Sequence, residues 1–393
     1  MESIKDKVAI VGMGCTRFGE RWDMGAADLM IDACYEAFAD AGIEPRDVQA
    51  AWLGELRSGV SGQMLSQALQ FQYIPITRVE NICCSGTEAL RAACYAVAAG
   101  VYDIALAVGV EKLKDHGETG LRPAPAIWDM DGTFPPSPPP TQFAMAATRY
   151  MHTYGLGYEK MKTALAKTAV KNHHNGMMSP KAHIHREITV DEAMNAPMVS
   201  WPLGLLDCCG VSDGAAAAVV VRADMAKNFK DDYILVKGLG VAVGAGQGST
   251  QDDWPFTSFP ETVYASKWAY AEAAITNPRE EVDLAIVHDC FTITELIIME
   301  DLGFSLKGRV VEDVDSGFFT LEGGLPVNTD GGLKCFGHPI GASGLRMVYE
   351  VYHQLRGKAD KRQLKKADIG LTQNLGGYPG RFTSAVAIFG RRD

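Results

Sequence analysis

The sequence predicts an α/β protein made of two related halves. Its 393 residues exceed what a single core usually holds. Apolar strand-like runs alternate with helix-like ones, which is typical of a parallel sheet covered by helices. A Ser-Gly helix start followed by an Asp-Ile strand occurs at 85–104 and again at 343–369. Two related halves would explain this echo, and coincidence between common Ser-Gly turns is the alternative.

The first half supplies the clearest elements. A buried strand is expected at 7–14, ending in a glycine turn, and a helix at 24–42 that Gly42 closes. Further elements are expected as strand, helix and strand at 48–53, 85–99 and 103–110.

Composition and charge argue against several kinds of partner and site. The net charge of −11 and the pI of about 5.4 argue against nucleic acid or anionic membranes as partners. We expect no membrane span, because no apolar run approaches about 20 residues. The N-terminus lacks a signal-peptide layout, which favours the cytoplasm. The nine cysteines are an odd number in a large chain without a signal-peptide layout, so we expect no disulfide framework. They include no CxxC pair, so we expect no metal site.

The stretch 115–205 interrupts the strand–helix rhythm. Its proline run, 135–140, cannot be regular structure, while helices are expected near 142–154 and 158–174. We interpret it as an excursion that covers one face; a floppy surface loop is the alternative. The expected domains are the first part of the N-terminal half, the covering insertion, the completion of that half and the C-terminal half, at 1–114, 115–205, 206–235 and 236–393.

Cys83 stands where a loop becomes a helix. Unpaired N–H groups and the helix dipole favour an anion there, so the pattern predicts a lowered thiol pKa and a better nucleophile. Gly86, one turn later, permits close approach of another backbone or of substrate. A buried capping cysteine is the plain alternative, and Cys84 is the rival for the role.

Three later segments carry further chemistry. In 337–344, His338 could take a proton from a thiol or point Nε2 at a carbonyl oxygen, or it could be structural. In 288–291, His288 and Cys290 follow an apolar strand and suit a hydrogen-bond donor and a proton carrier; alternatively Asp289 simply caps the next helix. The 374–380 segment reads as a loop that offers backbone N–H groups to an oxyanion, or as an ordinary glycine turn.

Together, these segments resemble the thiolase superfamily. Their order and spacing match across essentially the whole chain, and 79–80 and 212–217 are similar to the branch of sterol-carrier-protein-type and archaeal acetoacetyl-CoA thiolases. The resemblance implies a duplicated, five-layered αβαβα fold, with 115–205 as a loop domain over the CoA site.

The resemblance also implies residue roles. Cys83 takes the acyl group, and His338 activates the Cys83 thiol. His288 joins His338 in a first oxyanion hole. Cys290 carries the α-carbon proton, because Asn374 stands where better-known thiolases have a second catalytic cysteine. The N–H groups of Cys83 and Gly376 form a second oxyanion hole. Substrate contacts are expected from Ser85, Gly86, Gly337, Gly341, Ser343 and Asn374.

The implied activity is thiolytic cleavage of a 3-oxoacyl-CoA, or the reverse condensation. The substrate would be acetoacetyl-CoA or a bulky or aromatic 3-oxoacyl-CoA, with CoA as a substrate and no permanently bound cofactor. A homodimer or dimer of dimers is expected, with a small zinc-ribbon/OB-fold protein as a further partner. The alternatives are a ketoacyl- or hydroxymethylglutaryl-CoA-synthase-like enzyme, from which Cys290 distinguishes the chain, and a non-catalytic acyl-CoA-binding subunit.

Overall fold

The computed structural model describes residues 3–117, 138–249, 251 and 254–392, and nine strands form its main sheet. The sheet order is β3-β2-β4-β7-β1-β8-β11-β10-β9. The strands run, in chain order, over Val8–Cys15 (β1), Ala50–Gly54 (β2), Ile76–Val79 (β3), Ile104–Glu111 (β4), Gly214–Arg222 (β7), Ile234–Val243 (β8), Leu284–Val287 (β9), Ile369–Tyr378 (β10) and Arg381–Arg391 (β11).

The sheet confirms the duplication. The run β2-β4-β7-β1 is repeated as β9-β10-β11-β8, with one parallel pair followed by two antiparallel pairs in each. The halves join where β1 pairs with β8 at Ala9↔Leu235 and Ile10↔Ile234. The expectation of a parallel sheet was wrong for most pairs. β7 and β11 run antiparallel to their neighbours, and strand–helix alternation along the chain does not reveal such strands.

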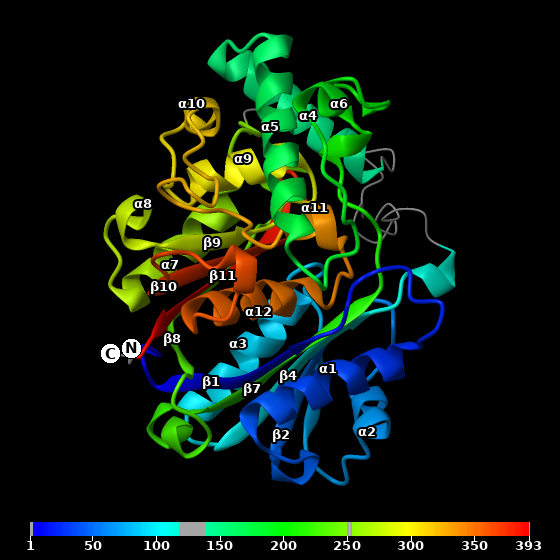
Figure 1. The fold of residues 1–393 in the computed structure, drawn as a ribbon, viewed down its shortest axis with the longest axis vertical. Helices are drawn as coiled ribbons and strands as arrows, with labels where there is room; N and C mark the ends of the chain where they lie inside the picture. Colours follow the sequence, from blue (N-terminus) through cyan, green and yellow to red (C-terminus); the bar gives the residue numbers. More distant parts are fainter. Residues whose placement is uncertain (1–2, 118–137, 250, 252–253, 393) are drawn as a thin grey trace.

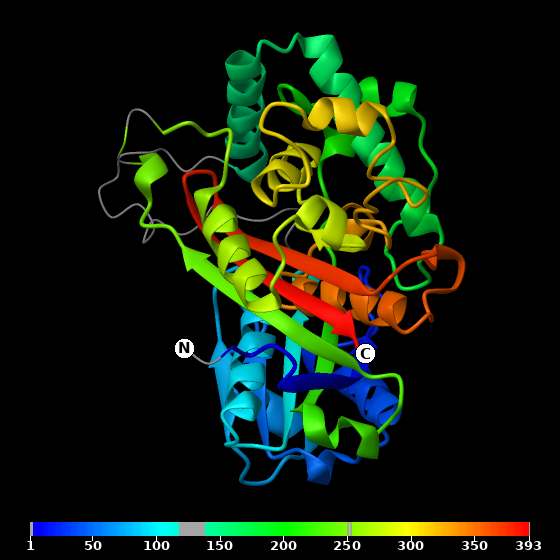
Figure 2. The same ribbon diagram turned by 90° about the vertical axis from the view of Figure 1, so that its left-hand side faces the viewer.

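Helices complete the layers (Figure 1). α1 (Ala26–Ala41) covers β1 and β7, and α7 (Pro260–Ala273) covers β8 and β11. α3 (Ser85–Ala98) and α12 (Ser343–Leu355) contact each other between the two sheet halves. Figure 2 shows α7 on the outer side of the sheet, which gives the order helix, sheet, helices, sheet, helix.

The other helices are α2 (Gln63–Leu69), which belongs to the N-terminal half, and those of the insertion and the C-terminal half. The latter are α4 (Pro139–Tyr154), α5 (Tyr158–Met177), α6 (Val190–Met194), α8 (Pro278–Glu281), α9 (Thr292–Asp301), α10 (Val310–Asp315) and α11 (Gly332–Phe336). A two-stranded hairpin, β5 (Met198–Ser200) with β6 (Leu203–Gly204), lies in the insertion. α5 packs against α9, α10 and α11, so the insertion rests on the C-terminal half (Figure 1).

The insertion corrects one prediction. Pro139 and Pro140 open α4, although the proline run was expected to exclude regular structure. Proline suits a first helical turn, where its missing N–H would have had no partner. Residues 135–137 of that run lie outside the described residues. Pro138 is described and directly precedes the helix. Within the described part of the chain, no helix has the length and apolarity needed to cross a membrane.

Candidate active site

A strained loop presents Cys83 at the start of α3. Ile82 adopts φ 51°, a left-handed conformation that is costly for a β-branched residue. Ser85 holds this turn, because its Oγ donates to the Ile82 carbonyl at 2.6 Å and accepts from the Asn81 N–H at 3.0 Å. Cys83 keeps 7% exposure. Ser85 holds the loop that presents it, and its predicted contact with substrate stays a prediction.

Cys84, the rival nucleophile, is tied down elsewhere. Its thiol lies 3.1 Å from the Asn374 carbonyl oxygen and 3.2 Å from that of Thr383. Its side chain is fully buried against β10 and β11. Cys84 is therefore held by the sheet, and Cys83 is the member of the pair that meets the histidines.

Cys83, His288 and His338 converge from distant parts of the chain. One side-chain donor atom from each lies within 4.8 Å of the other two. The imidazole centroids are 5.0 Å apart and nearly perpendicular, at 83°. Among the described residues, this is the one cluster of three or more Cys, His, Asp or Glu side chains close enough to hold a metal ion. The structure thus groups a thiol with two imidazoles, as the sequence predicted.

Close packing between α3 and α12 makes this convergence possible. A Cβ on Gly86 would stand 2.5 Å from the Gly341 carbonyl oxygen. A Cβ on Gly341 would stand 2.4 Å from the Val110 carbonyl oxygen. Any side chain would push the helix starts apart and move His338 away from Cys83. Gly86 and Gly341 therefore act in packing.

His338, which lies in the cluster with the Cys83 thiol, keeps one ring nitrogen without a hydrogen-bond partner. Ser343 donates its hydroxyl hydrogen to the Pro339 carbonyl at 2.9 Å, so Ser343 accepts from His338 Nδ1 at 2.7 Å. Nε2 is then the unprotonated nitrogen, and it is buried without a hydrogen-bond partner. Burial, reinforced by the positive charge of Arg346, lowers the His338 pKa to about 3. The backbone N–H of His338 donates to the Gly210 carbonyl at 3.0 Å. Gly337, the residue before His338, has φ 77°.

His288 lies just past the end of β9, beside β10. Asn374 Nδ2 lies 3.0 Å from His288 Nδ1, and Thr87 Oγ1 lies 3.3 Å from Asn374 Oδ1. Burial, then repulsion from His338 and Arg346, places the His288 pKa well below its usual value. The imidazole is therefore neutral near pH 7.

The segment with Asn374 and Gly376 corrects another prediction. It is not a loop: residues 374–376 lie inside β10, paired with Ala385, Ser384 and Thr383. A Cβ on Gly376 would stand 2.6 Å from the Asn81 carbonyl oxygen, so glycine lets β10 pass directly beneath the Cys83 loop. The backbone N–H that acts on the Cys83 thiol comes from Gly377, whereas that of Gly376 acts on Cys84.

The Cys83 thiol is less acidic than the sequence predicted. Burial raises its pKa to about 12, and Glu111 adds repulsion, while the Gly377 N–H lowers it only in part. The expected effect of the helix start does not overcome the loss of hydration. The resting thiol is protonated, so a nearby base must remove the proton.

Cys290 sits next to this cluster but outside its 4.8 Å limit. It is buried, and its Sγ lies 3.6 Å from Thr294 Oγ1. Burial is the main cause of its raised pKa, to which Cys209 and Cys83 contribute. Cys335 is occupied elsewhere, since its thiol donates to the Asn172 carbonyl at 3.2 Å.

Asp289 has a positioning role that the sequence did not reveal. It accepts from the Leu333 N–H at 2.6 Å and the Lys334 N–H at 3.1 Å, so it caps α11 rather than the following α9. α11 ends directly before Gly337 and His338. Asp289 thus links the two histidine segments, a contact between residues far apart in sequence.

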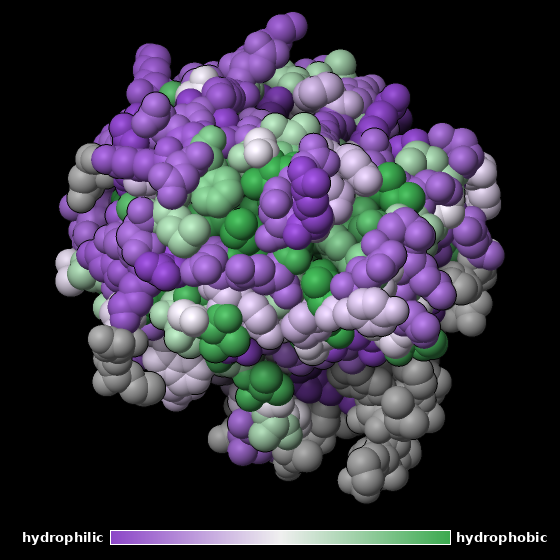
Figure 3. Space-filling model, turned by 90° about the horizontal axis from the view of Figure 1, so that it is seen from below, coloured by the Kyte–Doolittle hydropathy of each residue, from purple (hydrophilic) through white to green (hydrophobic). Residues whose placement is uncertain are grey.

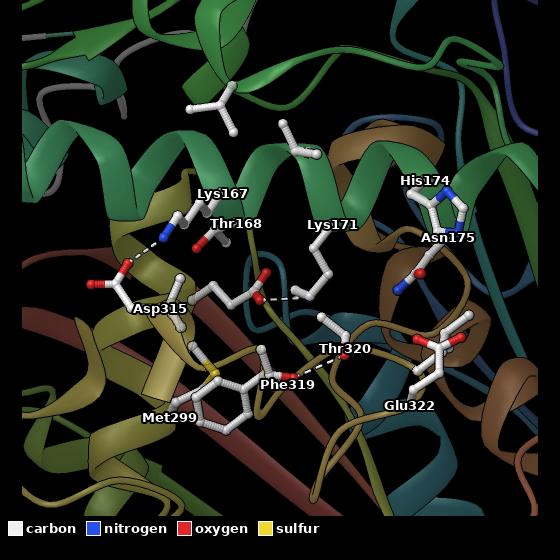
Figure 4. Close-up of a pocket in the computed structure, with 16 residues that line it drawn as sticks. Lys167, Thr168, Lys171, His174, Asn175, Met299, Asp315, Phe319, Thr320 and Glu322 are labelled. Atoms are coloured by element: carbon white, nitrogen blue, oxygen red, sulfur yellow. Dashed lines mark hydrogen bonds and ion pairs between the residues drawn. The ribbon is translucent and has the colours of Figure 1, made fainter. Parts of the chain in front are cut away.

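A separate pocket of about 360 Å³ lies between α5 and the 314–322 segment (Figure 4). Lys167, Lys171 and His174 of α5 face Met299 and Phe319 across it. Lys167 pairs with Asp315, and Lys171 pairs with buried Glu295. None of the predicted site residues lines this pocket, so it is separate from the cluster at Cys83.

Comparisons with known proteins show the family of the chain. A family model described as "Thiolase, N-terminal domain" matches residues 8–224, and "Thiolase C-terminal domain-like" matches 240–391. An acetyl-CoA acetyltransferase of Methanothermobacter thermautotrophicus is 39% identical over 98% of this chain and 99% of its own. The benzoylsuccinyl-CoA thiolase subunit BbsB of Thauera aromatica is 33% identical over 95% of this chain and 96% of its own.

A solved structure, the Ltp2-ChsH2(DUF35) aldolase, superposes with a TM-score of 0.87 at 26% identity, covering 99% of both chains. The sequence-based prediction of the family and of its archaeal branch is confirmed. The chain belongs to the thiolase family and is, like its acetyl-CoA acetyltransferase relatives, an acyltransferase that uses CoA thioesters.

Proposed function

We propose that this chain is a thiolase that cleaves a 3-oxoacyl-CoA through an acyl thioester on Cys83. The observation that carries the proposal is the meeting of a buried thiol with the bare Nε2 of His338 and a second imidazole. At pH 7 the His338 ring is neutral and its Nε2 lone pair is uncommitted, and because burial disfavours the imidazolium, the bound substrate must stabilise the charges that proton transfer creates.

The first step transfers a proton and an acyl group. His338 Nε2 takes the Cys83 proton, and the sulfur attacks the 3-oxo carbon of the substrate. The backbone N–H groups of Cys83 and Gly377, which act on the resting thiol, would stabilise the oxyanion, with Gly377 in place of the expected Gly376. Collapse breaks the bond between C2 and C3 and leaves the acyl group on Cys83.

The second step captures the leaving enolate. Its thioester oxygen would accept from His338, now protonated, and from His288. Cys290 donates its thiol proton to the α-carbon and gives acetyl-CoA or its analogue. Free CoA returns a proton to Cys290, its sulfur attacks the acyl thioester, and the departing Cys83 sulfur regains its proton from His338. Atoms and protons balance, and reversal of these steps is the condensation.

The test is incubation with acetoacetyl-CoA and CoA. We expect two acetyl-CoA for each acetoacetyl-CoA consumed, and no product from Cys83→Ala. A cleaving Cys83→Ala enzyme would indicate an aldol-type reaction, which needs no acyl-cysteine. Condensation without exchange of the α-protons of acetyl-CoA with solvent would indicate a ketoacyl- or hydroxymethylglutaryl-CoA-synthase-like enzyme. Activity that is lost with chelator and restored by zinc would turn the cluster into a metal centre.

The substrate's acyl group and the partners are part of the same proposal. Aromatic 3-oxoacyl-CoA is the second substrate class to assay, because a benzoylsuccinyl-CoA thiolase subunit is a relative. The ChsH2(DUF35) partner named in the similar structure supports a small accessory protein for this chain.

A homodimer is also proposed. β3 is an edge strand, and Val60 and Tyr73 expose 92% and 101% of their surface. The face below the N-terminal half carries hydrophobic residues among hydrophilic ones (Figure 3). Such edges often pair with a second copy. Sedimentation of the isolated chain, with and without a DUF35 protein, separates the two assemblies.

A further inference from the structure

We propose that Asn374, oriented by Thr87, is a positioning residue that holds His288 with its proton on Nε2. His288 is then in the opposite tautomer to His338. The inference deepens the proposed function, on which its catalytic meaning rests, but the tautomer itself is a property of the resting protein.

The tautomer of His338 is the reference point. A backbone carbonyl can only accept, so the hydrogen of Ser343 is committed to Pro339. His338 Nδ1 must therefore donate to Ser343, and Nε2 keeps its lone pair. If His288 also turned a lone pair to the same space, the site would offer an incoming oxygen no imidazole donor.

Asn374 supplies the opposite restraint to His288. Its amide oxygen accepts from the Thr87 hydroxyl at 3.3 Å, which leaves the NH₂ group facing His288 Nδ1 at 3.0 Å. Nδ1 then accepts, so the proton of a neutral imidazole resides on Nε2. The His288 pKa is well below its usual value, so a second ring proton is not present at neutral pH.

Tight packing keeps this restraint in place. Asn374 is fully buried, and Thr87 and His288 are each 2% exposed, so water does not compete for the amide. A Cβ on Gly344 would stand 2.3 Å from Thr87 Oγ1 and 2.8 Å from Asn374 Oδ1. Thr87 lies on α3, one turn after Cys83, so the nucleophile's own helix sets the donor.

The two neutral histidines then have separate tasks. His338 accepts the thiol proton, and His288 donates to the thioester oxygen throughout the cycle. Neither task requires a charged imidazole before substrate binds. Asn374, which lacks a usable acid or base, acts through His288 and not on substrate.

The direct test is ¹⁵N NMR of the resting wild-type protein labelled at histidine, with His288 assigned by difference from His288→Gln. We expect the Nε2–H form for His288 and the Nδ1–H form for His338. An Nδ1–H form at His288 overturns the proposal. This readout is independent of any substrate, so it stands apart from a failure of the proposed function.

Asn374→Asp gives a kinetic signature. A carboxylate accepts from Nδ1, so the charged imidazole still donates from Nε2 but the neutral ring does not. The ratio of variant to wild-type acyl-enzyme formation should fall about 10²-fold as pH rises through the raised His288 pKa. Wild-type His288 is neutral across this range and gives no such limb. A ratio independent of pH overturns the proposal.

Thr87 provides the matched pair. Thr87→Ser keeps the hydroxyl and should keep the NMR tautomer and the rate. Thr87→Val removes the donor, so the amide can turn; the rate should fall about tenfold and both tautomers of His288 should appear. A single Nε2–H tautomer in Thr87→Val shows that Thr87 does not orient the amide and overturns that part.

Discussion

The two halves share a strand order but carry different chemistry at corresponding strand ends. In the N-terminal half, the side chains at the ends of β2 and β4 are the buried carboxylates Glu55 and Glu111. Glu111 accepts from the backbone of Leu56 and Arg57 and from Gly341 of the other half. These carboxylates fasten loops and do not meet the thiol cluster.

In the C-terminal half, His288 follows β9 and Asn374 lies in β10, and both side chains are neutral. His288 belongs to the thiol cluster, and Asn374 contacts the cluster through His288. The N-terminal half contributes Cys83, because α3 begins against α12. The difference teaches that the repeated backbone carries loop-fastening carboxylates in one half and the two imidazoles of the cluster in the other. Substitutions in the two halves should therefore fail in different ways.

The largest effect is expected at Cys83. Cys83→Ala should lower the cleavage rate by on the order of 10⁴-fold or more, because the covalent path is lost. Cys84→Ala removes only a thiol that donates to the Asn374 and Thr383 carbonyls, so much of the activity should remain. Steady-state assays on both variants, with circular dichroism as the folding control, check this. Equal losses would remove the distinction between the neighbours.

Cys290 tests the division of labour within the C-terminal half. Cys290→Ser should slow cleavage by about 10²–10⁴-fold, because the enolate loses its acid. The variant should still form the Cys83 thioester from a simple acyl-CoA but should not exchange α-protons of acetyl-CoA with deuterated water.

Cys335→Ser is the matched control, since Cys335 is occupied with the Asn172 carbonyl. Deuterium exchange retained in Cys290→Ser and lost in Cys335→Ser would transfer the role to Cys335.

The histidines should each contribute about 10²–10³-fold, the range for one oxyanion-hole donor. His338→Ala should also prevent thioester formation, because the thiol with pKa about 12 loses its base. His288→Ala should slow that step as well, with folding intact. A loss below tenfold in His288→Ala would make His288 a structural residue.

Glu111 tests the N-terminal half through stability. Two donors approach each of its carboxylate oxygens. Glu111→Gln turns one oxygen into a donor and leaves at least one backbone N–H group unsatisfied, so the free energy of unfolding should fall by about 1–3 kcal/mol. Urea unfolding measures this, with exposed Glu322→Gln as control. An unchanged stability would show that Glu111 is not a fastening residue.

The smallest effect is the pH dependence of stability. Burial lowers the folded pKa of His338 to about 3, so the unfolded chain binds its proton first as the pH falls. This contribution is fully present above pH 6.5 and declines toward pH 3, by less than about 1.4 kcal/mol per pH unit. Urea unfolding at pH 7 and 5 should show a shallower decline in His338→Gln than in wild type. Equal slopes would mean that His338 is hydrated.

Sequence reasoning found the cluster because its members lie at helix starts and strand ends, which local patterns reveal. The pairing of Ser-Gly helix starts pointed to the duplication, and the resemblance pointed to Cys83, His288 and His338. The expected roles of Cys290 and of the oxyanion-hole groups remain predictions.

Contacts between distant segments, and the effect of burial on pKa values, could not be predicted from the sequence. The pKa of Cys83 depends on its loss of hydration, which outweighs the helix start. The backbone N–H that acts on the Cys83 thiol comes from Gly377 and not from Gly376, because N–H groups alternate along β10, a strand that resembled a loop. The contacts of Asp289 with α11 and of Thr87 with Asn374 join residues 44 to 287 positions apart.

The central claim is that the acyl group resides on Cys83. The direct measurement is mass spectrometry of the wild-type protein quenched in acid during turnover of acetoacetyl-CoA without added CoA, followed by peptide mapping. The account predicts one acetyl group on the peptide with residues 79–91, placed on Cys83 by fragmentation and absent in Cys83→Ala. An adduct on Cys84 or Cys290, or turnover with no adduct in a protein that cleaves the substrate, would contradict it.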